Sequence, residues 1–228
     1  MIFRQFFDEK TWTYSYLIAD PGKQEAAIID PVLDHTDHYL TVISNLDLKL
    51  VYSMDTHVHA DHITGTGKLG QLTDCTSVIG AQAKVECVDR KITEGETIKV
   101  GGLVLNVLYT PGHTDDSYSF LMKDRIFTGD TLLIRSTGRT DFQNGNADQQ
   151  YDSIFNKLLK LPDELLLYPA HDYKGWTVST IGEERRFNPR LQVPSRQAYV
   201  DQMNALKLDN PRFMDIAVPA NLKCGLID

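Results

Sequence analysis

Short apolar runs alternate along the chain with polar turns and with a few stretches of helical periodicity. In residues 48–55, for example, apolar and more polar side chains alternate, which predicts a strand with one buried face. The two residues between the runs 118–122 and 125–128 are expected to form a tight hairpin turn. The other runs that we expect to be strands are residues 26–29, 77–79, 103–110 and 165–168.

Helices are expected between some of these strands. Asp34 is placed to cap a helix that runs through residues 42–43. Residues 151–161 carry apolar side chains at helical spacing, and Pro162 follows them. Beyond Trp176 the chain is more polar and is expected to be helical or irregular.

We expect one α/β domain over residues 1–228, because strands and helices alternate and no repeat or low-complexity segment interrupts them. Residues 177–228 are expected to be a helical or irregular extension of that domain, since they are too few for a second one. Hydrophobic residues make up 42% of the chain and charged residues 24%, which is typical of a globular protein with a buried core.

Charge and cysteine content narrow the partners and the compartment. The net charge of −8 argues against nucleic acid or an anionic membrane as the main partner. No run approaches the roughly 18 apolar residues of a membrane helix, and the first 20 residues lack a signal-peptide layout. The cysteines Cys75, Cys87 and Cys224 are widely spaced, so no disulfide framework is expected. We therefore expect a cytoplasmic protein, or a mature chain whose targeting segment has been removed.

Residues 56–62 read T-H-V-H-A-D-H and carry four potential metal ligands directly after a predicted strand. Imidazole and carboxylate are ligands of transition metals such as zinc and iron. In extended backbone, alternate side chains share a face, so His57 and His59 can point at one ion. Asp61 and His62 follow across a turn. This spacing predicts a metal site.

Further ligand types recur where other predicted strands end. His113 follows the run 103–110, Asp130 follows 125–128, and His171 follows 165–168. Each has an ordinary explanation when taken alone, but together they indicate a site assembled from loops at one edge of a sheet. Residue type and spacing alone supply enough ligands for two metal ions and a binuclear hydrolase.

At these residues the chain resembles the metallo-β-lactamase superfamily, whose pattern is H-x-H-x-D-H followed by a separate His, Asp and His. The resemblance implies an αββα sandwich, with Asp30 supporting the metal loop. A closer resemblance is to the persulfide dioxygenases, the group of the ethylmalonic-encephalopathy protein. The segments that carry it are T-H-V-H-A-D-H-I-T-G-T-G (56–67), T-P-G-H-T-D-D-S (110–117), F-T-G-D-T-L-L-I-R (127–135), G-R-T-D-F-Q (138–143), Y-P-A-H-D-Y-K-G (168–175) and E-E-R-R-F-N-P-R-L (183–191).

This closer resemblance implies one Fe(II) per chain, held by His57, His113 and Asp130 in a two-His-one-carboxylate triad that leaves coordination positions open. It implies oxidation of glutathione persulfide by O2 and water to sulfite and glutathione. The side chains expected to orient ligands and waters around the iron are His59, Asp61, His62 and His171. The residues expected at the thiol substrate are Arg139, Arg190 and Tyr173, the last of which also lies beside the iron.

Other functions fit parts of this pattern. A glyoxalase-II-like binuclear hydrolase of S-acyl-glutathione is the alternative, although such hydrolases carry a longer helical C-terminal region. A metal-dependent sulfur carrier leaves the open coordination positions without a purpose, and a β-lactam hydrolase is disfavoured by the lack of an export signal. The resemblance leaves open a rhodanese-type sulfurtransferase as partner and a homodimer as the assembly.

Overall fold

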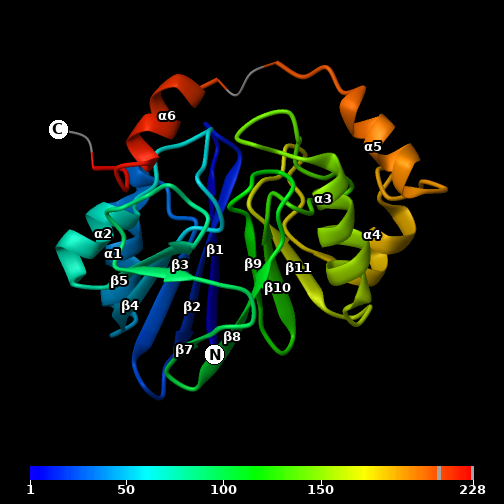
Figure 1. Cartoon of the computed structure of the whole chain (residues 1–228). Coiled ribbons are helices and arrows are strands. Elements are labelled where there is room, and N and C mark those ends of the chain that lie inside the picture. The colour runs from blue at the N-terminus through cyan, green and yellow to red at the C-terminus, as the bar shows by residue number, and fades with distance from the viewer. Residues whose placement is uncertain (210–211, 227–228) are drawn as a thin grey trace.

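Two six-stranded sheets face each other in the computed structural model, which describes residues 1–209 and 212–226 (Figure 1). The first sheet has the order β1-β2-β3-β4-β5-β6, and the second has the order β12-β11-β10-β9-β8-β7. The strands of the first sheet are β1 Ile2–Asp8, β2 Thr13–Asp20, β3 Glu25–Ile29, β4 Lys49–Met54, β5 Thr76–Gly80 and β6 Arg90–Ile92. Those of the second are β7 Thr97–Val100, β8 Leu103–Tyr109, β9 Tyr118–Leu121, β10 Arg125–Gly129, β11 Leu166–Pro169 and β12 Ser179–Thr180.

Helices cover the outer faces of both sheets, which confirms the expected αββα sandwich (Figure 1). The first sheet is covered by α1 Thr36–Asn45 and α2 Thr66–Thr73. The helices on the side of the second sheet are α3 Ala147–Tyr151, α4 Ile181–Phe187 and α5 Arg196–Asn204, whereas α6 Met214–Asn221 lies on the side of the first. No helix among these described residues is long and apolar enough to cross a bilayer.

The central core lies between the two sheets and is rich in aromatic side chains. Tyr16 and Phe127, one from each sheet, pack with their ring centroids 5.0 Å apart and are each about 1% exposed. Each fully buried side chain of this size contributes roughly 1.5–3 kcal/mol relative to an exposed one. This packing fixes the two sheets against each other and therefore fixes the strand ends that carry the ligand-type residues.

The strand directions bring those ends to one edge of the sandwich. In the first sheet β3 and β4 are parallel, and in the second β10 and β11 are parallel. β8 and β10 are both antiparallel to β9, so they run in the same direction. Because the carboxyl ends of strands that share a direction meet at one edge of a sheet, the loops after these strands converge there.

The expected strands are present, and their ends differ from the predicted ranges by one to a few residues. The expected cap at Asp34 is wrong: a short 3₁₀ turn, Leu33–His35, precedes α1, and His35 occupies the N-cap, where its side chain does not cap the helix. The Asp34 carboxylate instead accepts a hydrogen bond from Lys10 Nζ at 3.0 Å. Residues 151–161 are helical as predicted, but α3 passes into a π-helix, Asp152–Lys157, and then a 3₁₀ turn, Leu158–Lys160.

The structure contradicts the expectation that the cysteines form no disulfide. Cys87, between β5 and β6, is bonded to Cys224, just beyond α6, and the two residues are 137 positions apart in the chain. Cys75 is a free, buried thiol. Sequence spacing gave no sign of this pair, because only the fold brings the carboxyl-terminal segment beside the β5–β6 connection. The cysteine pattern therefore no longer supports a reducing compartment.

Reduction of this disulfide is expected to lower the free energy of unfolding by about 2–4 kcal/mol, because the cross-link closes a long loop in the unfolded chain. Urea unfolding of the oxidised and reduced protein, followed by circular dichroism, measures the difference. The Cys87→Ser variant should match the reduced protein and should not respond to reductant. Equal unfolding free energies for the oxidised and reduced forms would show that the cross-link is energetically neutral.

Candidate metal centre

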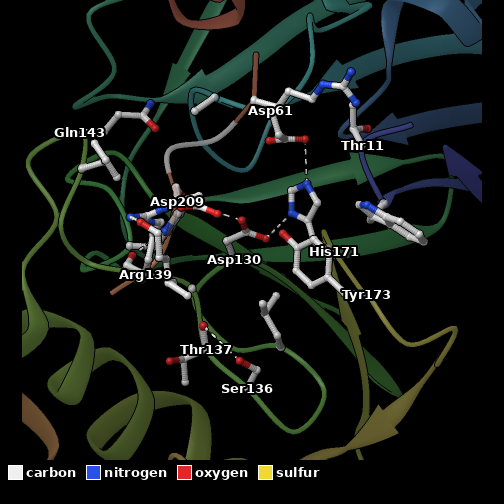
Figure 2. A pocket seen from close by; sticks show the side chains of 18 of the residues that line it. Thr11, Asp61, Asp130, Ser136, Thr137, Arg139, Gln143, His171, Tyr173 and Asp209 are labelled. Carbon is white, nitrogen blue, oxygen red and sulfur yellow. Dashed lines mark hydrogen bonds and ion pairs between the residues drawn. The ribbon is translucent and has the colours of Figure 1, made fainter. Parts of the chain in front are cut away.

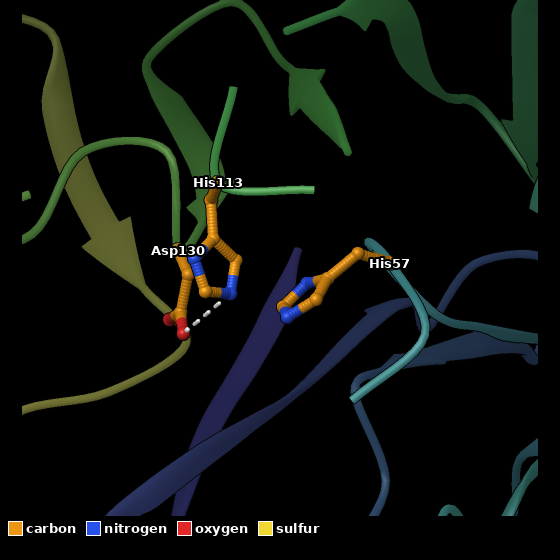
Figure 3. A group of neighbouring side chains, drawn as sticks. All are labelled: His57, His113 and Asp130. Carbon is orange, nitrogen blue, oxygen red and sulfur yellow. Dashed lines mark ion pairs between the residues drawn. The ribbon is translucent and has the colours of Figure 1, made fainter. Parts of the chain in front are cut away.

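Three ligand-type side chains from three loops meet at the edge of the sandwich. His57 follows β4, His113 lies between β8 and β9, and Asp130 follows β10. Each offers one ligand atom, and these atoms all lie within 4.8 Å of one another (Figure 3). His113 Nε2 is 3.5 Å from Asp130 Oδ2. The structure thus brings together the three residues that the resemblance implied as iron ligands.

Hydrogen bonds on the far side of each imidazole leave Nε2 unprotonated toward this group. His113 Nδ1 donates to the carbonyl oxygen of Arg139 at 2.7 Å. The Thr56 hydroxyl donates its one proton to Asp30 Oδ2 at 3.0 Å, so it accepts from His57 Nδ1 at 2.9 Å. Burial lowers the pKa of His57 well below its ordinary value, which keeps the ring neutral. Both imidazoles are therefore in the state that a metal ion needs.

His171 lies between two carboxylates and forms a hydrogen bond with each of them. Its Nδ1 lies 2.6 Å from Asp130 Oδ1, and its Nε2 lies 2.8 Å from Asp61 Oδ2 (Figure 2). Burial alone would lower the pKa of His171, but Asp130 and Asp61 outweigh it and raise this pKa well above the ordinary value. Burial likewise opposes ionisation of Asp130, yet the charge of His171 holds the pKa of this carboxyl below its usual range. In the metal-free site both nitrogens of His171 therefore donate, and His171 would have to lose a proton to bind a metal.

A second ligand-type group lies beside the first. His59, Asp61 and His62 each offer a ligand atom within 4.8 Å of the others. His62 Nδ1 donates to Asp61 Oδ2 at 2.8 Å, while His62 Nε2 and His59 Nδ1 are buried without a hydrogen-bond partner among the described residues. Buried polar atoms without a partner mark places where an ion or a water can bind. The donor set therefore fits metal binding at this edge, and these two nitrogens are the observation that favours a second ion.

Asp30 organises the loop that carries these histidines. Its carboxylate accepts from the Thr56 amide at 2.7 Å and from His59 Nε2 at 3.1 Å. Burial opposes protonation of His59, but Asp30, with Asp61 and Asp55, outweighs it and raises the pKa of His59 to about 9. At neutral pH in the metal-free site, His59 therefore carries both ring protons and cannot act as a ligand without losing one.

Two further residues of this site had no clear signal in the sequence pattern. The carboxylate of Asp116, in the connection between β8 and β9, accepts a hydrogen bond from the Val58 amide at 2.9 Å and so supports the histidine loop. Thr13, on β2, donates from its hydroxyl to Asp61 Oδ2 at 3.0 Å. Asp116 lies three residues after His113, which places it inside a segment that carried the resemblance, whereas Thr13 is linked to the site only by the fold.

A cavity of about 540 Å³ opens next to the three ligands (Figure 2). His113, Asp130 and His171 line this cavity, and its volume is in the range of small-molecule sites. The Tyr173 ring stacks on His171 with centroids 6.1 Å apart and planes 5° apart, and it forms part of the cavity wall. The structure therefore places the Tyr173 ring against His171 and in the wall of the cavity.

Arg139, Arg190 and Arg212 line this cavity, and the first two differ in how their charges are balanced. The Arg139 guanidinium donates to both oxygens of Asp141, at 2.6 and 2.8 Å, and to the Asp209 carbonyl at 2.6 Å. Arg190 has no carboxylate within ion-pair distance among the residues that the structure describes, and its Nη1 lies 3.3 Å from Met203 Sδ. Burial lowers the pKa of Arg190. Of these two, Arg190 therefore presents the less compensated positive charge.

Comparisons with known proteins agree with this geometry. The profile described as Metallo-beta-lactamase superfamily matches residues 13–171. A protein of Mus musculus named persulfide dioxygenase ETHE1, mitochondrial, is 47% identical over 233 positions, which cover 99% of this chain and 89% of that protein. The crystal structure of ETHE1 from Myxococcus xanthus has a TM-score of 0.97 and 52% identity, covering 99% of this chain and 100% of that one. A hydroxyacylglutathione hydrolase of Dictyostelium discoideum is 32% identical over 170 positions, which cover 70% of this chain and 62% of that protein.

Proposed function

We propose that this chain, which belongs to the metallo-β-lactamase superfamily, is a persulfide dioxygenase that uses one Fe(II) ion. The observation that carries the single ion is the pairing of both His171 nitrogens with the carboxylates of Asp130 and Asp61. A histidine whose two nitrogens both donate to carboxylates has no lone pair to offer a second ion. Because both nitrogens of His171 donate hydrogen bonds, the ligands that remain are His57, His113 and Asp130, a two-His-one-carboxylate set.

The reaction converts glutathione persulfide, O2 and water into glutathione, sulfite and two protons. The outer sulfur gives four electrons to O2, and the three oxygen atoms of sulfite come from O2 and one water molecule. His57, His113 and Asp130 would hold the iron, and Fe(II) there would supply electrons for the reduction of O2, which redox-inert zinc would not. The chain's own contribution is to hold the ligands. The carbonyl of Arg139 and the Thr56 hydroxyl fix His113 and His57 in the unprotonated-Nε2 tautomer.

The cavity walls supply the groups for binding the persulfide. Arg190 has donors and a charge suited to a carboxylate of glutathione, and no carboxylate of the described chain neutralises it. Arg139 lines the same cavity, where its bonds to Asp141 and to the Leu208 and Asp209 carbonyls fix the wall. The Tyr173 hydroxyl, on the ring that stacks against His171, is placed to donate to the substrate sulfur or to oxygen.

A binuclear hydrolase of S-acyl-glutathione is the second candidate. The unpartnered nitrogens His59 Nδ1 and His62 Nε2 favour it, since a second ion bound there would use them. Against it stand the proton on His59 at neutral pH and the two carboxylate bonds of His171. The match to the hydroxyacylglutathione hydrolase also spans less of both chains than the matches to the dioxygenases.

The activity is tested by loading the purified protein with Fe(II) and adding glutathione persulfide in an oxygen electrode. We expect O2 uptake with sulfite formed in a one-to-one ratio, and no uptake with glutathione alone. An S-acyl-glutathione thioester is offered in parallel, and its hydrolysis should stay at the level of the metal-free protein. Thioester hydrolysis without persulfide-dependent O2 uptake, with iron present in the protein, would favour the hydrolase instead.

Arg190→Ala is expected to raise the KM for glutathione persulfide by about 10- to 100-fold with a smaller change in kcat, because a charge-assisted hydrogen bond is worth roughly 1.5–3 kcal/mol. Arg139→Ala is also expected to raise KM, because its removal releases the cavity wall at Leu208 and Asp209. Steady-state O2 uptake at varied persulfide concentration measures both. Arg186→Ala is the matched control, since Arg186 is exposed on α4 and does not line the cavity. Unchanged KM values in both variants would show that neither Arg139 nor Arg190 contributes to substrate binding.

Location and assembly stay predictions. The mammalian relatives carry the word mitochondrial in their names, whereas the sequence pattern predicted the cytoplasm for this chain. A rhodanese-type sulfurtransferase that delivers the persulfide, and a homodimer, also stay predictions. Size-exclusion chromatography with light scattering measures the assembly directly.

A further inference from the structure

The carboxyl-terminal turn, residues 221–225, lies against the metal loop, residues 57–64. Asn221 is the last residue of α6, and only 4% of it is exposed. Its Nδ2 donates to the carbonyl of His59 at 2.9 Å and to the carbonyl of His62 at 2.8 Å. Its Oδ1 accepts from the Thr64 amide at 2.8 Å. One buried amide thus makes three hydrogen bonds to three residues of the metal loop.

The hydrogen bonds from Asn221 matter because residues 57–64 lie in no helix or strand, so the metal loop has no regular pattern of backbone hydrogen bonds. Buried backbone groups in irregular segments need partners, and a partner with a fixed position also fixes the orientation of the peptide. Asn221 orients the peptides that follow His59 and His62, while Asp30 and Asp116 hold the amides of Thr56 and Val58. The carboxylates of Asp30 and Asp116 thus hold the backbone at the start of the metal loop, and Asn221 holds the backbone of its later residues.

The carboxyl-terminal turn is itself fixed in place at close range. The Gly67 amide donates to the Cys224 carbonyl at 3.0 Å, which ties the turn to the start of α2. Gly225 has a φ of +71°, and a Cβ there would lie 2.0 Å from the Thr64 carbonyl oxygen, so only glycine fits against the loop. The disulfide from Cys224 to Cys87 then ties the turn covalently to the segment between β5 and β6.

We propose that Asn221 is a positioning residue for the metal centre, and that the Cys87–Cys224 disulfide holds Asn221 in register with the metal loop. The proposal uses the metal centre of the proposed function and is independent of which reaction takes place there. It predicts that loosening the turn weakens metal binding through the loop, although no atom of residues 221–225 belongs to the ligand group.

Asn221→Asp is the sharpest test, since it keeps the shape of the side chain but sets an acceptor against two carbonyl oxygens. We expect the Fe(II) dissociation constant to rise about 10- to 100-fold, the range typical of residues that orient ligands. Amide hydrogen exchange in the metal-free protein should speed up at residues 57–64 and stay unchanged in the strands of the second sheet. Asn204→Asp, at the exposed end of α5, is the matched control and should alter neither readout.

An Asn221→Asp protein that folds, binds Fe(II) as tightly as the wild type and shows unchanged exchange at residues 57–64 would overturn the proposal. If that variant does not fold, Cys87→Ser carries the test, since Cys87 is exposed and far from the ligand group in the chain. It should give the same two changes in smaller measure. Unchanged Fe(II) affinity and loop exchange in Cys87→Ser would then overturn the proposal. Neither readout depends on dioxygenase activity, so failure here is distinct from failure of the proposed function.

Discussion

Replacing Asp130 with alanine is expected to abolish iron binding and dioxygenase activity together. Asp130 is the single carboxylate of the ligand group formed with His57 and His113, and its other oxygen holds His171. Residues that only orient ligands typically change metal affinity by about 10- to 100-fold. Loss of a ligand itself should therefore exceed about 100-fold in Fe(II) affinity, with O2 uptake falling to the level of the metal-free protein.

Metal analysis after dialysis, together with O2 uptake, measures the effect of Asp130→Ala. The matched variant is Asp61→Asn, which alters the other carboxylate bound to His171 but leaves all three proposed ligands in place. Asp61→Asn should retain one iron per chain with reduced activity. Full iron content and activity in Asp130→Ala, or equal loss of iron in both variants, would contradict the assignment of the ligands.

Replacing His171 with glutamine is expected to lower the free energy of unfolding of the metal-free protein by about 3–5 kcal/mol, the usual cost of breaking a buried ion pair by removing one partner. His171 is about 1% exposed and lies between Asp130 and Asp61. Without its positive charge the two carboxylates face each other uncompensated. We also expect weaker Fe(II) binding, since Asp130 loses the bond that orients it.

The pH dependence of this loss follows from the directions of the pKa shifts. The raised pKa of His171 gives stability that is full below its unfolded value of 6.5 and is lost as pH rises through the folded value. The lowered pKa of Asp130 gives stability that is present above its unfolded value of 3.8 and is lost as pH falls through the folded value. The deficit of His171→Gln should therefore be largest between these two unfolded values.

Urea unfolding across this pH range measures the deficit, with His38→Gln on the exposed face of α1 as control. A deficit below about 1 kcal/mol at every pH would show that His171 is not an ion-pair partner in the metal-free site. A wild-type protein with two irons and a His171→Gln variant with one would instead identify His171 as a ligand of a second ion.

The positions of the ligand-type residues could be predicted from the sequence because strand ends are visible in the hydropathy pattern. A strand that stops just before His113, Asp130 or His171 places that residue at the edge of a sheet, and parallel strands bring such edges together. What each residue does there could not be predicted in this way. The tautomer of His113 depends on the Arg139 carbonyl, and the protonation of His171 depends on Asp61, contacts that only the fold creates.

The contacts of Asn221, the disulfide and strand β1 could not be predicted from the local sequence either, because they depend on partners far away in the chain. Asn221 contacts the metal loop across more than half of the chain, and Cys87 and Cys224 meet across 137 positions. In β1, the side chains Phe3, Phe6 and Phe7 fall on both faces of the strand, so no simple alternation marked it, and both faces are partly covered in the structure. Long-range partners of this kind follow from sheet order, which hydropathy does not encode.

A titration of the metal-free protein with Fe(II), with persulfide-dependent O2 uptake recorded after each addition under otherwise anaerobic handling, tests the central claim most directly. Among the described residues, His57, His113 and Asp130 form a ligand set in which both imidazoles present an unprotonated Nε2, so activity should rise linearly and stop at one Fe(II) per chain. Activity that keeps rising to two Fe(II) per chain, or no O2 uptake at any ratio, would contradict the account.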